Sequence, residues 1–408
     1  MKQTVKQFLH KEGGYVLGAS FFTKAIAFIS SLVLVRVLSP SEYGTLAYVL
    51  SALAFFIPFS GGGLQHSFMR FAPLYNSIPK VNALFRFSLI KGLLISGFIA
   101  FVLYLSIPFL DLNTISPIYF YVLLAYLFTD FFLEMVKVNY RVLNKNKTFA
   151  SVDALSAGLL AFFGCLSAYY FGSLAYVLVL VIAPLLVGLF HLRITNTVVA
   201  RIPKDYYYYG LWVGIGSIAS QLMYSLDVFL VGQLINDTTQ VAVYRSASII
   251  PIALFFIPNS YITTHYADLA KNSTNKSYLI SFAKQYMKLF TLVALGIAFP
   301  LYILAESIIV ILFGQDYIES VPLFRVLILG MLGAFIFRIP FGNLLAAVGK
   351  SNWNAFVAFS ILILNAILNY YAISRIGIMG AALVTSSLFW ISGIVSLLLF
   401  LIYLKKLK

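Results

Sequence analysis

The chain has 408 residues, of which 61% are hydrophobic and only 10% are charged. With a mean hydropathy of +0.94, this composition excludes a water-soluble globular protein and indicates a membrane protein. The net charge of +15 does not indicate binding of nucleic acid, because the lysines and arginines lie in short segments between apolar runs and not on one polar face.

Twelve stretches contain about 20 predominantly apolar residues each, which is the length that crosses a bilayer. In chain order, the predicted spans are Gly14 to Leu38, Gly44 to Met69, Phe87 to Leu110, Pro117 to Val136, Thr148 to Phe171, Leu174 to Leu192, Gly210 to Leu234, Val241 to Thr264, Tyr286 to Phe313, Pro322 to Ala346, Trp353 to Ile373, and Ile378 to Leu404.

The distribution of charge sets the predicted topology. Most of the 28 lysines and arginines fall in alternate loops and at the two ends of the chain. Because basic residues accumulate on the cytoplasmic side, we expect a multi-pass protein of the plasma membrane with both termini cytoplasmic.

Two sequence matches indicate an internal repeat. Gly210-Leu-Trp-Val-Gly214 matches Gly14-Tyr-Val-Leu-Gly18, and the stretch 255–260 echoes the stretch 55–60. The predicted fold is an all-α integral membrane protein with twelve transmembrane helices in two parallel six-helix repeats around a central cavity. The predicted lobes are residues 1–200 and 201–408.

Basic residues inside the predicted spans are the candidates for binding substrate. A charged side chain near the bilayer centre costs at least ~2.5 kcal/mol, so it needs a partner or water. We expect Lys24, Arg245 and Arg338 to line a cationic cavity for an anionic head group, since Lys and Arg pair strongly with phosphate. Arg36, at the outer end of the first span, either faces the mouth of this cavity or snorkels to the interface.

Asp227 is the candidate for ion coupling. A carboxylate in an apolar span is a candidate for a functional site, and here it could bind a proton or a sodium ion that couples transport to a gradient. The alternative is an internal ion pair, Asp227 with Arg245 or with Lys24, that only fixes helix packing. Another charged group, Asp130, Glu134 and Lys137, follows one helix face, and this spacing favours a local charge ladder.

The second span contains residues that weaken a helix. Gly61, Gly62 and Gly63 follow Pro58, and they either break the helix at mid-depth or allow close packing against a neighbour. Pro58 and Pro258 occupy matched places in the two repeats. We therefore regard these five residues as candidates for a gate or hinge.

The sequence favours a protein without catalysis, metal or cofactor. Gly349-Lys350-Ser351 resembles the end of a phosphate-binding loop, but Leu344 stands where that loop requires glycine. The four histidines have no paired metal spacing, and the single cysteine, Cys165, lies in an apolar run. The predicted outer loops are too short to gather the polar groups of an enzyme.

Several short motifs occur in a specific order. They are Leu34-Val-Arg36-Val-Leu38-Ser-Pro40-Ser-Glu42-Tyr43-Gly44, then Asp227 followed by Gly232, Tyr244-Arg245, Asn343 to Gly349-Lys350, and Asn365 to Asn369 followed by Gly377-Ile-Met-Gly380-Ala381-Ala382. In these motifs the chain resembles, over essentially its whole length, the polysaccharide-transporter branch (the Wzx-like oligosaccharide flippases) of the multidrug, oligosaccharidyl-lipid and polysaccharide exporter superfamily.

The resemblance implies alternating access between two lobes. It also implies movement of a polyprenyl-diphosphate-linked oligosaccharide, a surface polysaccharide precursor, from the inner to the outer leaflet. The partners expected are this lipid-linked oligosaccharide, membrane lipids, and a polysaccharide polymerase with glycosyltransferases. Two alternatives stay open: a gradient-driven exporter of drugs or organic cations, and a non-transporting scaffold for polysaccharide assembly. The excess of buried bases over acids favours an anionic cargo.

Overall fold

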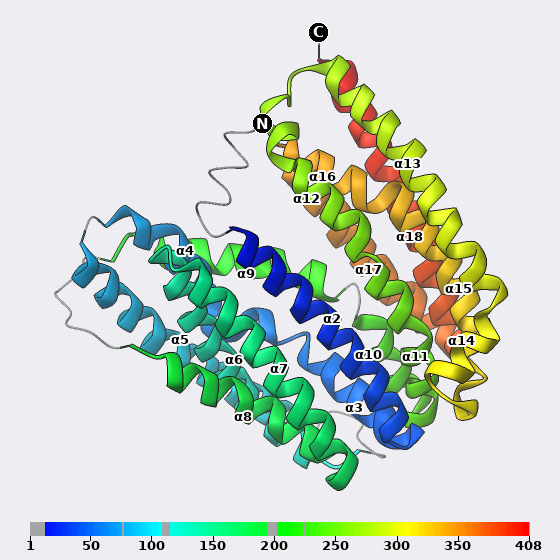
Figure 1. The fold of residues 1–408 in the computed structure, drawn as a ribbon, viewed down its shortest axis with the longest axis horizontal. Helices are drawn as coiled ribbons and strands as arrows, with labels where there is room; N and C mark the ends of the chain where they lie inside the picture. Colours follow the sequence, from blue (N-terminus) through cyan, green and yellow to red (C-terminus); the bar gives the residue numbers. More distant parts are fainter. Residues whose placement is uncertain (1–12, 76, 108–114, 194–201, 223–224, 408) are drawn as a thin grey trace. The chain divides into compact units, whose positions relative to one another are not determined.

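A computed structural model describes residues 13–75, 77–107, 115–193, 202–222 and 225–407, and every element in these ranges is a helix (Figure 1). Within the described residues, eleven helical segments are long and apolar enough to cross a membrane. The prediction of an all-helical, multi-pass protein is therefore confirmed. The remaining predicted span, Gly210 to Leu234, is covered by two shorter helices, α9 and α10.

The chain divides into two compact units, Met1–Ile218 (unit 1) and Ala219–Lys408 (unit 2). Unit 1 contains α2 (Gly13–Val37), α3 (Pro40–Leu53), η1 (Ile57–Gly63), α4 (Leu64–Phe71), η2 (Ala72–Leu74), α5 (Ile78–Ser106), α6 (Ile118–Val142), α7 (Asn146–Phe171), α8 (Ser173–His191) and most of α9 (Tyr206–Leu222). Unit 2 contains α10 (Leu226–Ile235), α11 (Thr238–Leu254), α12 (Phe256–Lys271), α13 (Lys276–Ile303), α14 (Ala305–Leu312), η4 (Gln315–Tyr317), α15 (Ser320–Gly333), η5 (Ala334–Arg338), α16 (Ile339–Ala347), α17 (Ser351–Ile376) and α18 (Ile378–Lys406).

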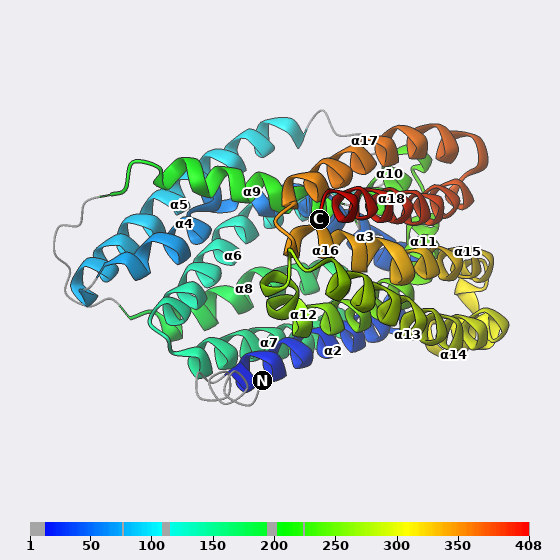
Figure 2. The ribbon, with the colours of Figure 1, turned by 90° about the horizontal axis from the view of Figure 1, so that it is seen from above.

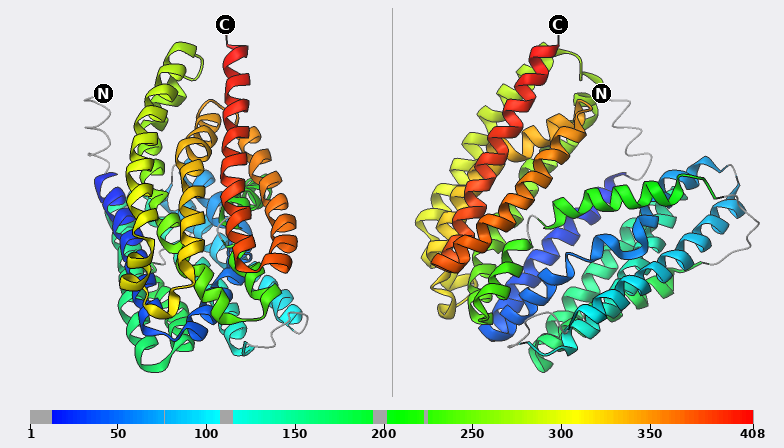
Figure 3. Two further views of the ribbon diagram at one scale, coloured as in Figure 1. Left: turned by 90° about the vertical axis from the view of Figure 1, so that its right-hand side faces the viewer. Right: turned by 180° about the vertical axis from the view of Figure 1, so that it is seen from behind.

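Long helices form most of each unit. In unit 1, α2 packs along α7, as Figure 2 shows from above. In unit 2, α17 packs along α18 (Figure 3). Both α7 and α17 end at a single glycine with positive φ, Gly172 at 78° and Gly377 at 63°, after which the next helix begins at once. The α7–α8 hairpin of unit 1 and the α17–α18 hairpin of unit 2 therefore have the same single-glycine connection.

The motif after the first span acts as a helix start. Ser39 caps α3: its hydroxyl accepts from the backbone N–H of Glu42, and the Glu42 side chain accepts in return from the N–H of Ser39. Pro40 occupies the first helical turn, where a missing N–H costs nothing. This capping box separates α2 from α3.

The second span is broken where the sequence predicted a weak point. Helix α3 ends at Leu53, and the η1 segment contains Gly61, Gly62 and Gly63 with φ of 65°, 61° and 73°. Ser96 of α5 accepts the N–H of Gly61 at 2.9 Å, so a neighbouring helix satisfies the interrupted backbone. The three glycines therefore break the helix and also allow close packing against a neighbouring helix, so both interpretations from the sequence hold.

Helix α9 packs against this break inside unit 1. A Cβ built on Gly63 would lie 2.0 Å from the carbonyl oxygen of Gly210. The Ser67 hydroxyl donates to the backbone carbonyl of Tyr206 at 2.6 Å. The phenol oxygen of Tyr206 lies 2.6 Å from the hydroxyl of Ser88. The predicted lobe boundary follows residue 200, whereas unit 1 continues to residue 218 through these contacts.

Three predicted continuous spans of unit 2 are interrupted. Phe255 separates α11 from α12, which places Pro258 in the first turn of α12. Leu304 separates α13 from α14, and a π-helical turn, η5, lies between α15 and α16. Such π turns widen a helix locally and are frequent at functional sites.

Candidate functional site

The most buried charge of unit 2 is Asp227, in the first turn of α10. Its side chain is 4% exposed. Four neutral groups donate hydrogen bonds to the carboxylate: the Tyr244 hydroxyl at 3.0 Å, Asn365 Nδ2 at 3.1 Å, Asn369 Nδ2 at 2.8 Å and the Thr385 hydroxyl at 2.5 Å. These donors come from α11, α17 and α18. The carboxylate therefore joins four helices, and all four of its hydrogen-bond donors are neutral.

Two oxygen atoms beside this carboxylate have no hydrogen-bond partner in the described part of the chain. They are Oδ1 of Asn365 and Oδ1 of Asn369, and both residues are at least 97% buried. The two residues lie four positions apart, so they share one face of α17. Rotating either amide would turn its oxygen toward Asp227. The side chains can thus present donors to the carboxylate, or oxygens to a cation next to it.

A small cavity lies beside Asp227. It has a volume of about 20 Å³ and is lined by Tyr244, Ser248 and Thr385 together with apolar residues of α11, α15 and α18. One water molecule or one small ion requires roughly 10 to 15 Å³ measured in this way. Polar groups from three helices therefore surround a space of suitable size for a monovalent cation.

Arg245 does not neutralise Asp227. Both residues are described, and the structure shows no ion pair between them; the four neutral donors bind the Asp227 carboxylate instead. The alternative of an Asp227 to Arg245 ion pair is therefore wrong. Arg245 is half-buried on α11, directly after Tyr244. Successive residues on a helix face different directions, so the base and the phenol that binds Asp227 point to different neighbours.

Arg338 ends the π turn η5. Its Nη1 donates to Oδ1 of Asn354 in α17 at 3.0 Å, and a Cβ on Gly342 would lie 2.5 Å from that nitrogen. The glycine therefore provides the space that the guanidinium occupies. This contact ties the widened part of the span to α17, so at least part of the role of Arg338 is structural.

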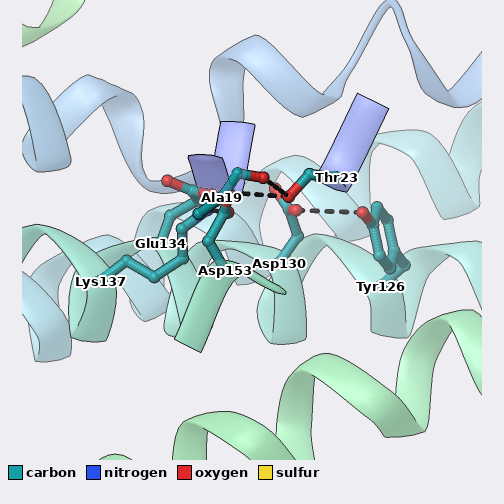
Figure 4. A network of polar contacts seen from close by, with 7 residues as sticks. All are labelled: Ala19, Thr23, Tyr126, Asp130, Glu134, Lys137 and Asp153. Atoms are coloured by element: carbon teal, nitrogen blue, oxygen red, sulfur yellow. Dashed lines mark hydrogen bonds and ion pairs between the residues drawn. The ribbon is translucent and has the colours of Figure 1, made fainter. Parts of the chain in front are cut away.

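Unit 1 contains a second charged cluster, shown in Figure 4. Lys137 of α6 pairs with Glu134 at 2.5 Å and with Asp153 of α7 at 2.7 Å. Asp153 also accepts from Thr23 of α2 at 3.2 Å, and Asp130 accepts from the phenol of Tyr126 at 3.0 Å. The predicted ladder on α6 thus extends to two neighbouring helices and forms a packing contact.

The other predicted residues lie at the surface of unit 1 or at the helix breaks. Lys24 and Arg36 are exposed on α2, and Arg36 lies in its last turn. Pro58, Gly61, Gly62 and Gly63 lie in the break of the second span, and Pro258 lies in the first turn of α12. The structure does not bring Lys24, Arg245 and Arg338 together within one unit.

Sequence reasoning found Asp227 but missed its partners. Asn365 and Asn369 entered only as part of a motif, and Thr385 was not singled out. The signal available was the four-residue spacing of two amides in an apolar helix, which places both on one face. No group of three or more His, Cys, Asp or Glu side chains that would suit a metal ion occurs among the described residues.

The described helices define a class, the multi-pass all-helical membrane proteins. A structure of an inward-facing multidrug resistance transporter of the MATE family matches with a TM-score of 0.76 at 15% identity, covering 94% of this chain and 95% of that one. The lipid II flippase MurJ, in an inward closed conformation, matches with a TM-score of 0.74 at 14% identity, covering 96% of this chain and 87% of that one. At such identity the likeness shows the fold alone.

The sequence comparisons define the family. A profile described as polysaccharide biosynthesis protein matches residues 33–322. A putative O-antigen transporter of Shigella flexneri is 25% identical over 181 residues, which are 44% of this chain and 43% of that protein. The alignment thus spans less than half of that curated relative. The chain belongs to the polysaccharide biosynthesis protein family, as a Wzx-like member of the exporter superfamily, and the resemblance predicted from its motifs is confirmed.

Proposed function

We propose that the protein is a flippase that moves a polyprenyl-diphosphate-linked oligosaccharide from the inner to the outer leaflet of the plasma membrane by alternating access. Family membership and the partial match to a putative O-antigen transporter support this choice of cargo. The finer architecture belongs to the same proposal. It has twelve spans in two six-helix repeats around a central cavity, with both termini cytoplasmic.

The observation that supports coupled transport most strongly is Asp227. A buried carboxylate held only by neutral donors costs free energy that an ion pair would reduce, so a protein with a purely structural role gains little from it. A non-transporting scaffold should instead pair its intramembrane charges. Asp227, with Asn365, Asn369 and Thr385, is proposed to bind a proton or a sodium ion whose gradient drives the cycle.

The basic residues are proposed to bind the anionic part of the cargo. Lys24 and Arg245 would hold the diphosphate or an acidic sugar, Arg338 would contribute in reserve, and Arg36 would lie at the cavity mouth. Arg245 follows Tyr244, which donates to Asp227, so a shift of α11 would move both at once. The adjacent positions of Tyr244 and Arg245 would therefore link ion binding at Asp227 to cargo binding at Arg245.

The helix breaks are proposed to permit the change in access. Pro58 and the Gly61 to Gly63 segment interrupt the second span, and Phe255 with Pro258 interrupts the corresponding span of unit 2. Glycines with positive φ change backbone angles at little cost in this region. The polyprenyl tail would remain in the lipid while the polar head crosses.

Translocation in proteoliposomes tests the proposal. A fluorescent polyprenyl-diphosphate oligosaccharide is placed in the inner leaflet, and a membrane-impermeant quencher reports its arrival outside, with and without a sodium or proton gradient. We expect protein-dependent movement that a gradient accelerates, and a loss of about tenfold or more in Lys24→Ala/Arg245→Ala, since two charge-assisted contacts are removed. The matched control is Lys405→Ala, a base on α18 that makes no ion pair among the described residues.

The same vesicles separate the alternatives. Movement at an unchanged rate in a well-folded Lys24→Ala/Arg245→Ala variant would show that these bases do not bind the cargo. No movement of any lipid-linked oligosaccharide, together with gradient-driven export of a fluorescent organic cation, would assign the protein to the drug exporters instead.

A further inference from the structure

Two lysines from distant parts of unit 2 converge on one tryptophan. Lys350, in the turn between α16 and α17, and Lys406, the last residue of α18, each place Nζ 5.6 Å from the ring centroid of Trp353. The two ammonium groups thus lie beside the same indole ring, and their flexible four-carbon stems can bring both to one anion. In the described residues neither lysine makes an ion pair, and the indole N–H of Trp353 donates to no described group.

The position of Lys350 is fixed by the end of α16. The N–H of Gly349 donates to Ala346 O at 3.1 Å, and the N–H of Lys350 donates to Leu345 O at 2.8 Å. These are the two bonds of a Schellman motif, and Gly349 supplies the required left-handed residue with φ of 78°. The stretch that resembles a phosphate-binding loop is therefore a rigid helix end that presents a lysine.

The position of Lys406 is fixed from the opposite side. The loop between α12 and α13 holds the end of α18, because the Tyr403 hydroxyl donates to Ser273 O at 2.9 Å and Lys276 Nζ donates to Leu407 O at 3.1 Å. Figure 1 shows this loop beside the C-terminal end of α18, at the top of the view. Two side-chain hydrogen bonds to backbone carbonyls thus hold the end of α18 that carries Lys406.

Apolar side chains continue from this cluster along the same helices. Phe356, one turn into α17, is 73% exposed, and Ile402, one turn before Lys406 on α18, is 44% exposed. Both helices are long and apolar enough to cross a membrane, so these residues face the acyl region just inside the charged layer. The arrangement is cationic at the interface and apolar directly below it, which matches a lipid and does not match a soluble anion.

We propose that Lys350, Lys406 and the indole N–H of Trp353 bind the headgroup phosphate of an anionic glycerophospholipid, with an acyl chain along Phe356 and Ile402. The phosphate offsets the repulsion between the two ammonium groups and accepts from all three donors. Occupation links α16, α17 and α18 at their common end. This site is separate from Asp227 and independent of the cargo proposed above.

Quenching of tryptophan fluorescence by brominated lipid tests the site. The full chain is reconstituted in phosphatidylcholine vesicles that contain brominated phosphatidylglycerol or, at the same fraction, brominated phosphatidylcholine. The difference between the native chain and Trp353→Phe isolates the signal of Trp353, because both chains keep Trp212 and Trp390. We expect the anionic lipid to quench Trp353 preferentially.

The lysine variants measure the contribution of each charge. Lys350→Gln and Lys406→Gln should each lower the preference for phosphatidylglycerol about fivefold, the equivalent of about 1 kcal/mol for one basic residue at an anionic surface. Lys405→Gln is the matched control, because this neighbouring lysine is exposed and has no contact with Trp353. Single variants at these surface positions keep the packing of the helices.

Three outcomes would overturn the site. Equal quenching by the two lipids in the native chain would show that no anionic headgroup is preferred. A preference that falls equally in Lys405→Gln and Lys406→Gln would show only a diffuse surface charge. Loss of the preference on addition of inorganic phosphate at constant ionic strength would identify a soluble anion as the ligand.

Discussion

The two units each hold a buried polar cluster, and the clusters differ in what balances the negative charge. In unit 1, Lys137 pairs with Glu134 and Asp153. In unit 2, Asp227 has four neutral donors and no basic partner among the described residues. The first cluster carries its own counter-charge, whereas the second does not.

This difference indicates a role in helix packing for the unit 1 cluster and a role in coupling transport to an ion gradient for the unit 2 cluster. An internal ion pair is satisfied by the fold alone and has little tendency to exchange its base for a solvent ion. A carboxyl group with only neutral donors has no internal counter-charge, so binding of an external proton or cation can stabilise it. Of the two clusters, the one in unit 2 is therefore the better candidate for coupling transport to an ion gradient.

The substitution with the largest expected effect is Asp227→Asn. It keeps the size of the side chain but removes the charge, so gradient-driven translocation should fall about tenfold or more, since a charged ligand is lost. Asp130→Asn in unit 1 is the matched control, because this carboxylate also accepts from a tyrosine hydroxyl. The proteoliposome assay with an imposed sodium or proton gradient measures both. Equal losses in the two variants would remove the distinction between the clusters.

Thr385→Val should have the next largest effect. The change preserves shape and removes the shortest of the four hydrogen bonds to Asp227, and a hydrogen bond to a charged group contributes about 1.5 to 3 kcal/mol. We expect the ion concentration for half-maximal transport to rise about tenfold while the maximal rate changes little. Thr129→Val, on α6 and likewise buried, should leave it unchanged. A fall in maximal rate with unchanged ion dependence would argue for a structural hydroxyl.

The sequence predicted the membrane class, most helix positions and the break at Gly61 to Gly63, because these depend on local patterns. It also located Asp227, since a lone carboxylate in an apolar run is conspicuous. The donors around it could not be predicted, because Asn365 and Thr385 are brought to Asp227 only by the packing of α10 against α17 and α18. Residue spacing alone does not determine such contacts.

Other features that the sequence did not predict also depend on tertiary packing. The π turn that ends at Arg338 lies between Gly333 and Pro340, and the interruption at Leu304 follows Pro300 by four residues. These residues stand inside apolar runs of spanning length, so the sequence pattern did not show that the spans are interrupted there. The contribution of α9 to unit 1 rests on the close approach of Gly210 to Gly63. A repeat pattern places these two glycines in different halves, and only tertiary packing brings them together.

Lys137→Met tests the other side of the comparison. It leaves Glu134 and Asp153 without a base, and removing one partner of a well-buried pair costs about 3 to 5 kcal/mol. Because Glu134 is 41% exposed, water will screen part of this loss, and we expect about 1 to 3 kcal/mol. Thermal unfolding in detergent measures it. Adding Asp153→Asn should restore part of the stability, because it removes the carboxylate that lost its base. Adding Asp227→Asn should restore none. Restoration by both substitutions would contradict a local interaction between Lys137 and Asp153.

Glu134→Gln should have the smallest effect of the series. The side chain is partly solvated, and Lys137 keeps its second partner, Asp153, at 2.7 Å. An exposed ion pair contributes about 0 to 1 kcal/mol, so the midpoint of unfolding should shift by no more than about 2 to 4 °C for a chain of this size. Ion-driven translocation should remain at the native rate. A clear loss of transport without a loss of stability would contradict the assignment of the unit 1 cluster to packing, and would move the coupling site toward α6.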